Sequence, residues 1–256
     1  MDVFYFKLLL SFLVGGAYIA FTIWLSEKFG SKIGGIVIGL PSTSLVGLLF
    51  IALTQGNAAA VAAVPIMPAV AGVNSILVAL FVLFHKFGWK LALAAAFVFW
   101  LAASMFLVML PLDSLALSLA IAAALYAISA GYLCRFPHRK AAARHSSAGE
   151  FLLRAVFAGT VVAAAVLLAR ANGPLWGGVL SNFPAAFTCT LILISRKHGE
   201  DFTASVGRTM AFASIAAVSF SVAFYFLVLP LGLFLGASLS LAASVTVGLA
   251  IYKFAM

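Results

Sequence analysis

The stretch GGIVIGLP, residues 34–41, lies within an apolar segment that would otherwise suit a continuous helix. Adjacent glycines and a proline oppose that helix, because glycine loses more conformational entropy on folding and proline lacks a backbone donor. A second stretch, GGVLSNFP at residues 177–184, has two glycines and a proline at the same spacing. The repeated pattern predicts two interrupted helices, around which the rest of the fold is organised.

The composition predicts an integral membrane protein. Of the 256 residues, 65% are hydrophobic and 8% are charged, and the mean hydropathy is +1.22. A soluble domain has about 25% charged residues, so this chain could not cover a surface facing water. The apolar runs are continuous over some twenty residues and do not alternate with the period of two that barrel strands require. The fold class is therefore predicted to be all-α.

The apolar runs predict about nine transmembrane helices, each long enough to cross about 30 Å of hydrocarbon. They are expected at residues 4–26, 33–55, 59–84, 91–110, 114–134, 152–170, 175–195, 202–228 and 231–252. The first run is interpreted as a structural helix because no A-x-A cleavage site follows it. The longest polar interruption, residues 134–150, is expected to be a loop.

The basic residues predict the orientation. If the N-terminus is outside, eleven of them fall on the other side, Arg154 and Arg208 lie just inside helix ends on that same side, and only Lys7 and Arg170 remain outside. The eleven are Lys28, Lys32, Lys86, Lys90, Arg135, Arg139, Lys140, Arg144, Arg196, Lys197 and Lys253. The positive-inside rule then places the C-terminus in the cytoplasm and the protein in the cytoplasmic (inner) membrane. This rule also accounts for the net charge of +9 without a nucleic-acid partner.

An internal duplication relates the two interrupted stretches. A shift of 143 residues aligns residues 9–57 with residues 152–200 without a gap. The matched positions are Gly16 with Gly159, Gly30 with Gly173, Gly34 and Gly35 with Gly177 and Gly178, Gly56 with Gly199, and Pro41 with Pro184. Aliphatic matches between two apolar segments mean little, but hydrophobicity does not explain a match at every glycine of the second window.

The duplication predicts two four-helix repeats, residues 1–112 and 151–256, joined by a connector helix and a basic cytoplasmic loop at residues 113–150. Because a single connector helix separates them, the second repeat enters the membrane from the opposite side to the first. This 4+1+4 arrangement with inverted topology resembles the construction of many secondary transporters.

The two interruptions predict a binding site, since they approach the membrane interior from opposite faces. Backbone groups freed by a proline are tolerated in a bilayer only against protein or a water-lined cavity. Paired Gly/Pro-interrupted segments in two halves are the best sequence indication of a transporter site. The predicted substrate-binding residues are Pro41, Ser42, Thr43, Ser44, Asn74, Ser181, Asn182, Pro184, Thr188 and Arg208, with Leu40 and Phe183 as walls.

Simpler interpretations stay open for several of these residues. Small and hydroxyl side chains let transmembrane helices approach closely, and Asn74 suits an interhelical hydrogen bond as well as a ligand. Arg208 suits an anionic solute, but it could also snorkel to the interface or pair with Glu200 or Asp201. Arg154, at the start of the sixth segment, is interpreted as an interface anchor.

The ionisable residues limit the function classes. The acidic residues are all predicted at helix ends or in loops, and the histidines in loops, so a buried proton relay is not expected. No HExxH or GxSxG motif is present, and Cys134 and Cys189 are far apart. No catalytic residue, metal site or cofactor is therefore predicted, although a coupling sodium ion bound by carbonyls and hydroxyls stays open.

We therefore expect a secondary transporter that moves a small neutral or anionic solute across the membrane by alternating access, and not an enzyme. The alternative is a channel for a small solute or ion, lined by the same interrupted helices. The expected partners are the solute and membrane lipids, and a homodimer is left open.

Overall fold

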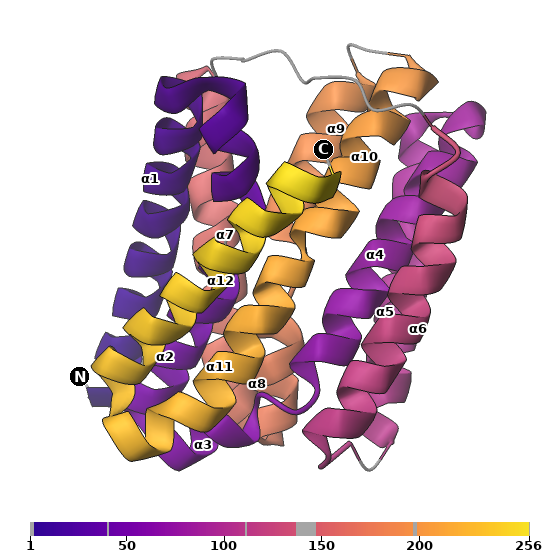
Figure 1. Cartoon of the computed structure of the whole chain (residues 1–256). Coiled ribbons are helices and arrows are strands. Elements are labelled where there is room, and N and C mark those ends of the chain that lie inside the picture. The colour runs from indigo at the N-terminus through magenta and orange to yellow at the C-terminus, as the bar shows by residue number, and fades with distance from the viewer. Residues whose placement is uncertain (1–2, 40, 111, 137–146, 197–198, 256) are drawn as a thin grey trace.

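The computed structural model describes residues 3–39, 41–110, 112–136, 147–196 and 199–255, and within these ranges the regular structure is entirely helical. The predicted Leu40 wall lies outside the described residues. The helices, shown in Figure 1, are α1 (Val3–Gly39), α2 (Ser42–Gln55), α3 (Asn57–Ala62), α4 (Met67–Phe84), the 3-10 helix η1 (His85–Phe87), α5 (Trp89–Met109), α6 (Leu115–Leu133), α7 (Ala148–Asn172), α8 (Pro174–Ser181), α9 (Ala185–Ser195), α10 (Glu200–Ala213), α11 (Ile215–Leu231) and α12 (Leu233–Ala255).

By length and apolar composition, eight helical stretches of the described chain can cross a membrane. Two of them join consecutive helices: Pro174–Ile192 combines α8 with most of α9, and Asp201–Leu231 combines α10 with α11. α2 is apolar but has only 14 residues. The prediction of an all-α fold is confirmed for the described residues, and the long apolar helices are compatible with a multi-pass membrane protein, while the count of nine crossings stays a prediction.

The first connection differs from the prediction. The backbone is helical from Val3 to Gly39, through residues 27–32 where the sequence predicts a loop between two helices. Polar residues do not by themselves end a helix, whereas the missing N–H of Pro41 does. A straight helix of this length would extend about 55 Å. Instead, Figure 1 shows α1 turning back at the upper end of the bundle.

The helices run alternately toward the two ends of the bundle. The C-terminal ends of α4, α6 and α9 lie at the upper end in Figure 1, whereas α3 and α8 lie at the lower end. Exposed basic residues mark the upper end: Lys86 belongs to η1, and Arg135 and Arg196 follow α6 and α9 within two residues. We refer to this end as the basic end of the molecule.

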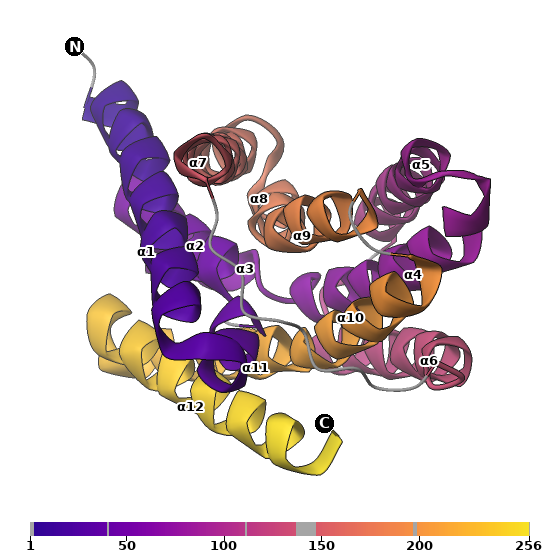
Figure 2. The same cartoon turned by 90° about the horizontal axis from the view of Figure 1, so that it is seen from above.

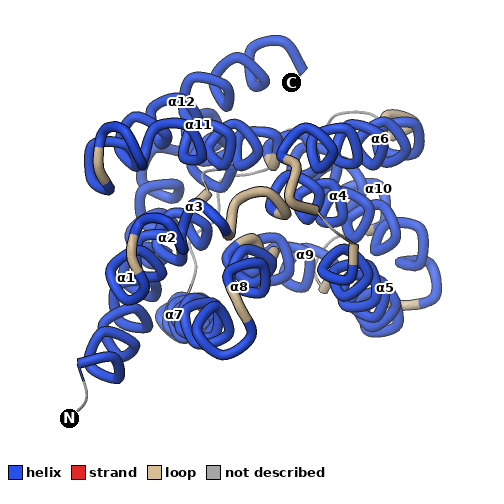
Figure 3. Tube along the Cα trace, turned by 90° about the horizontal axis from the view of Figure 1, so that it is seen from below, coloured by secondary structure: helices blue, strands red, loops and turns tan. Residues whose placement is uncertain are grey.

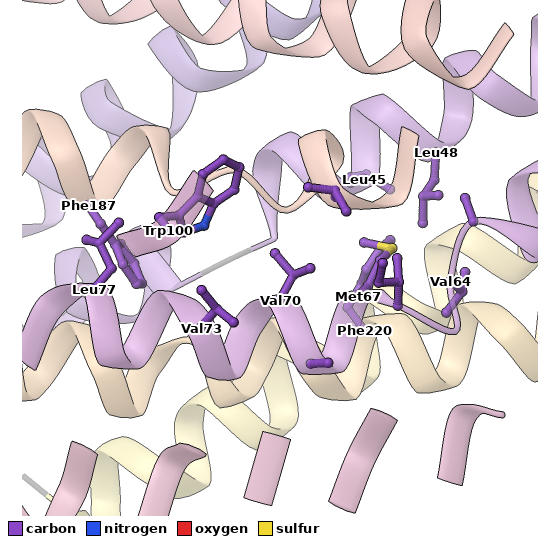
Figure 4. Packing of buried hydrophobic residues seen from close by; sticks show 14 of the residues in the cluster. Leu45, Leu48, Val64, Met67, Val70, Val73, Leu77, Trp100, Phe187 and Phe220 are labelled. Atoms are coloured by element: carbon purple, nitrogen blue, oxygen red, sulfur yellow. The ribbon is translucent and has the colours of Figure 1, made fainter. Parts of the chain in front are cut away.

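α4 is the central helix of the fold. In the most apolar stretch of its span, 78% of the residues are buried inside the protein, whereas in the corresponding stretch of α6 only 17% are buried. It contacts α5, α6, α10 and α11, which surround it in Figure 2. Figure 4 shows Met67, Val70 and Leu77 along α4, with Trp100 of α5 over the same face. The other spans leave more of their surface outside the core, as lipid-facing helices do.

The contact between α1 and α7 has an unusual symmetry. A Cβ on Gly16 would lie 2.8 Å from the carbonyl oxygen of Ala155, and a Cβ on Gly159 would lie 2.5 Å from that of Phe12. Gly16 and Gly159 are related by the shift of 143 residues, as are Phe12 and Ala155. The two helices therefore make the same close approach in both directions, and at both points only a glycine leaves room for it.

Candidate functional site

Both predicted interruptions are breaks in the structure. Pro41 stands before α2 with φ −75° and ψ 57°, and Pro184 stands before α9 with φ −80° and ψ 53°. The carbonyl of each proline accepts the first hydrogen bond of the following helix, from the N–H of Leu45 at 2.7 Å and from that of Thr188 at 2.9 Å. Two positions 143 residues apart thus have nearly the same backbone conformation.

Polar side chains from several helices meet where the break between α8 and α9 contacts α2 and α4. We call Ser44, Asn74, Trp100, Ser181 and Asn182 the break cluster. Figure 3 shows α2, α3 and α8 close to one another, and α8 contacts both of the others. All five residues are buried, with exposed fractions of 1% for Ser44, 4% for Asn74, 2% for Trp100, 0% for Ser181 and 6% for Asn182.

Hydrogen bonds join the break cluster across the two halves of the chain. Asn74 Nδ2 donates to the carbonyl oxygen of Asn182 at 2.8 Å. Asn182 Nδ2 donates to the carbonyl oxygen of Met67 at 2.7 Å. Ser44 Oγ donates to the carbonyl oxygen of Ser181 at 3.1 Å and lies 3.4 Å from Asn182 Oδ1. The carbonyls of Ser181 and Asn182 at the end of α8, and that of Met67 at the start of α4, therefore accept hydrogen bonds from side chains of the other half.

Trp100 fixes the orientation of the Asn74 amide. Its Nε1 donates to Asn74 Oδ1 at 2.7 Å, which turns Asn74 Nδ2 toward Asn182. An indole nitrogen is only a donor, so the oxygen of the amide must face it. The sequence alone gives no signal for this role, because a tryptophan in an apolar segment is equally expected in a packed core or at a membrane interface.

Phe183 lies in the break and closes one side of the cluster. Its ring centroid is 4.9 Å from that of Trp100 and 5.8 Å from those of Phe97 and Phe157. These rings come from α5 and α7, so the break between α8 and α9 is held between two other helices. The role of Phe183 as a wall of a solute site stays a prediction.

Ser181 has a buried polar atom without a partner. Among the described residues, its Oγ accepts and donates no hydrogen bond. It lies against Gly47 of α2, where an added Cβ would overlap it. A buried hydroxyl without a partner costs about 1–3 kcal/mol, so such an atom in a polar site is a candidate contact for a bound solute.

The other predicted residues lie around the breaks or apart from them. Pro41 and Ser42 are buried and Thr43 is half-buried at the start of α2. Thr188 Oγ1 bonds the carbonyl of Pro184 at 2.9 Å, so it satisfies its own helix. Arg208 is held elsewhere, because its Nη1 donates to the carbonyl oxygen of Phe136 beyond the end of α6, at 3.1 Å.

The chemistry of the break cluster is that of a neutral polar site. It contains hydroxyl, amide and indole groups, which bind solutes by hydrogen bonds. In the described part of the chain, no three His, Cys, Asp or Glu side chains gather as metal ligands would. The cluster itself therefore offers neither a general base nor the usual donor set of a transition metal.

The fold and this site define the class of the protein: an all-helical, multi-pass membrane protein with a buried polar cluster between two broken helices. A family model described as "Protein of unknown function (DUF3147)" matches residues 8–111. No curated protein and no solved structure matches the chain. The matched segment is less than half of the chain. It contains Ser44, Asn74 and Trp100, but neither α8 nor α9.

Proposed function

We propose that the chain is a secondary transporter that moves a small neutral or anionic solute across the cytoplasmic membrane by alternating access. One observation carries the proposal: two helix breaks, 143 residues apart in sequence, belong to segments that meet at a single buried polar cluster. Irregular backbone within a membrane is tolerated where it is buried in protein or lines a water-filled cavity, and transporters place their solute sites at such broken helices between their two repeats.

We also propose that the two halves are inverted repeats in the predicted 4+1+4 order, with the N-terminus outside. Two observations support this symmetry. The backbone angles of Pro41 and Pro184 agree within a few degrees. The close approach of α1 to α7 at Gly16 and Gly159 is reciprocal, as a contact across a twofold axis must be.

Alternating access gives the hydrogen bonds of the break cluster a direct role. Three of these hydrogen bonds join one half of the chain to the other: Ser44 to Ser181, Asn74 to Asn182, and Asn182 to Met67. Rocking one half against the other would break these bonds together and expose amide and hydroxyl groups to a solute. A solute with its own donors and acceptors would replace them, which couples binding to the motion.

The closure of the site favours a carrier over a channel. The break cluster is buried and bonded internally, and the Phe183 ring packs against rings of α5 and α7. A channel requires a path that is continuous when open and a site that binds weakly. A carrier instead requires a site that is closed on at least one side in each state.

Entrance counterflow in liposomes tests the proposal. Thermal stability with a panel of neutral and anionic solutes, with and without sodium, first identifies a ligand, because ligands raise the melting temperature by mass action. Liposomes preloaded with that unlabelled solute should then accumulate labelled solute transiently. Uptake that neither saturates nor responds to preloading would contradict a carrier and favour the channel.

The cluster is tested with a double variant. Ser44→Ala combined with Asn182→Ala should abolish counterflow, as should Ser42→Ala combined with Asn182→Ala if Ser42 also contacts the solute. Ser129→Ala is the matched control, because Ser129 is 2% exposed but bonds only the Tyr126 carbonyl of its own helix, at 3.0 Å. Unchanged uptake in the first double variant would refute the assignment of the site.

A further inference from the structure

Arg154 differs from the other cations of the described chain. It lies in α7, seven residues into the helix, and its side chain is half-buried. Its Nε is buried and has no hydrogen-bond partner among the described residues. Burying a guanidinium nitrogen without an acceptor is costly, so this position calls for a partner that the described residues do not supply.

Other buried or half-buried cations are supplied with partners. Arg208 donates to the carbonyl of Phe136 at 3.1 Å, and Lys7 Nζ donates to the carbonyl of Leu53 at 2.6 Å. Even the exposed Arg170 lies over the ring of Phe4, 3.8 Å from its centroid. Snorkelling takes the outer guanidinium nitrogens of an arginine toward water, but it leaves the buried Nε of Arg154 without an acceptor among the described residues.

α7, which carries Arg154, packs against α9. The charge of Arg154 is near enough to Cys189 of α9 to act on its thiol. Cys189 is five residues beyond Pro184, or roughly 8 Å along the helix. Arg154 also precedes Phe157, which contacts Phe183 in the break, by about one turn, so it lies nearer the basic end than the break does.

The same face of α7 leads from Arg154 to the break cluster. Phe157, one turn further along α7, contacts the Phe183 ring at 5.8 Å. Phe183 in turn contacts Trp100 of the break cluster at 4.9 Å. A cationic group, a set of aromatic rings and a polar cluster thus follow one another from the basic end toward the middle of the membrane.

We propose that Arg154 binds the oxyanion group of the transported solute, which is then a small organic or inorganic anion carrying a carboxylate or a phosphate. This inference rests on the proposed transport function and narrows its substrate class. Guanidinium is the preferred partner of such groups because its planar fork bonds two oxygens at once. The same chemistry is present in the phosphate of a lipid headgroup, so the experiment must separate the two sources.

Thermal unfolding of the purified full-length chain in neutral detergent tests the proposal. The probes are sodium acetate, benzoate and phosphate, each compared with sodium chloride at equal ionic strength. At about a hundred times Kd, one of these anions should raise the melting temperature by roughly 5–10 °C. Arg154→Gln should abolish the rise and Arg154→Lys should weaken it. Arg196→Gln should leave it unchanged, because Arg196 is exposed at the same end.

The basal stability of Arg154→Gln is a second readout. Arg154→Gln removes a guanidinium whose buried Nε has no partner among the described residues. The melting temperature of this variant, measured with no anion added, should therefore be equal to or higher than that of the original chain. A marked fall would show that the guanidinium has a structural partner and would overturn the proposal. So would the absence of any response to the three anions, or a response that persists in Arg154→Gln.

Lipid is distinguished by a separate series in which phosphatidylglycerol or phosphatidylcholine is added to the micelles. Stabilisation by phosphatidylglycerol alone, lost in Arg154→Gln and not reproduced by the free anions, would assign Arg154 to a lipid headgroup and overturn the solute assignment. If the anions fail but a neutral solute still stabilises the protein through Ser44 and Asn182, the role of Arg154 is refuted and the transporter proposal stands.

Discussion

Asn74→Ala should destabilise the protein through two hydrogen bonds at once. The amide of Asn74 accepts from Trp100 Nε1 at 2.7 Å and donates to the carbonyl oxygen of Asn182 at 2.8 Å. Trp100 is 2% exposed and Asn182 is 6% exposed, so water does not readily replace the lost amide. The variant leaves a buried donor on one helix and a buried acceptor at the break between two others.

The magnitude follows from what interhelical bonds contribute in membranes. Such bonds average about 0.6 kcal/mol and reach about 1.7 kcal/mol, so the loss of two should cost about 1–3 kcal/mol. Trp100→Phe removes only the indole donor and keeps a ring beside Phe183, so it should cost about half as much. Ser129→Ala should cost almost nothing, because Ser129 bonds a carbonyl of its own helix.

Equilibrium unfolding in mixed micelles measures these differences. Circular dichroism follows the unfolding of all three variants, and tryptophan fluorescence follows that of Asn74→Ala and Ser129→Ala, which keep Trp100. The expected order of destabilisation is Asn74→Ala, then Trp100→Phe, then Ser129→Ala. If Asn74→Ala is no less stable than Ser129→Ala, the amide is not a structural link between the halves. The reasoning from burial to energy would then be refuted for this cluster.

Two further perturbations test the packing around the site. Gly159→Ala should lower the melting temperature, because its Cβ would lie 2.5 Å from the carbonyl oxygen of Phe12. Gly149→Ala in the same helix is the control and should not lower it, since nothing lies within 4 Å of its Cβ. Equal effects of the two variants would contradict the close approach of α1 and α7. Phe183→Ala should increase the leak of the identified solute from liposomes. It should also change the fluorescence emission of Trp100, whose ring centroid lies 4.9 Å from that of Phe183. An unchanged leak would show that this ring does not close the site.

The sequence predicts the membrane class and both helix breaks for reasons that are local. A scarcity of charge and long apolar runs decide the class, and a proline without an N–H decides where a helix must end. The connection at residues 27–32 is predicted less well, because the polar residues there can continue a helix while the chain turns. There the backbone is helical as far as Gly39, and the break comes at Pro41.

The site is predicted only in part, because part of it depends on contacts between distant segments. Ser44 and Asn182 are found from their places beside the prolines, and Asn74 from its polarity at membrane depth. Trp100 is not found, since its bond to Asn74 depends on how α5 packs against α4. The same holds for the cations: Arg208 has the neighbouring carbonyl of Phe136 as a partner, whereas the Nε of Arg154 has none among the described residues.

The energies of the break cluster are consistent with the proposed transport cycle. Four contacts join the halves there: Ser44 to Ser181, Ser44 to Asn182, Asn74 to Asn182, and Asn182 to Met67. At the average for interhelical bonds they contribute about 2 kcal/mol together, which thermal motion can overcome. In the proposed cycle, a difference of this size between the two states would make the closed form the major state and leave the other form a few per cent of the population. An anion held by Arg154 could shift that balance only by binding the two states differently. The transport proposal therefore requires the environment of Arg154 to change between them.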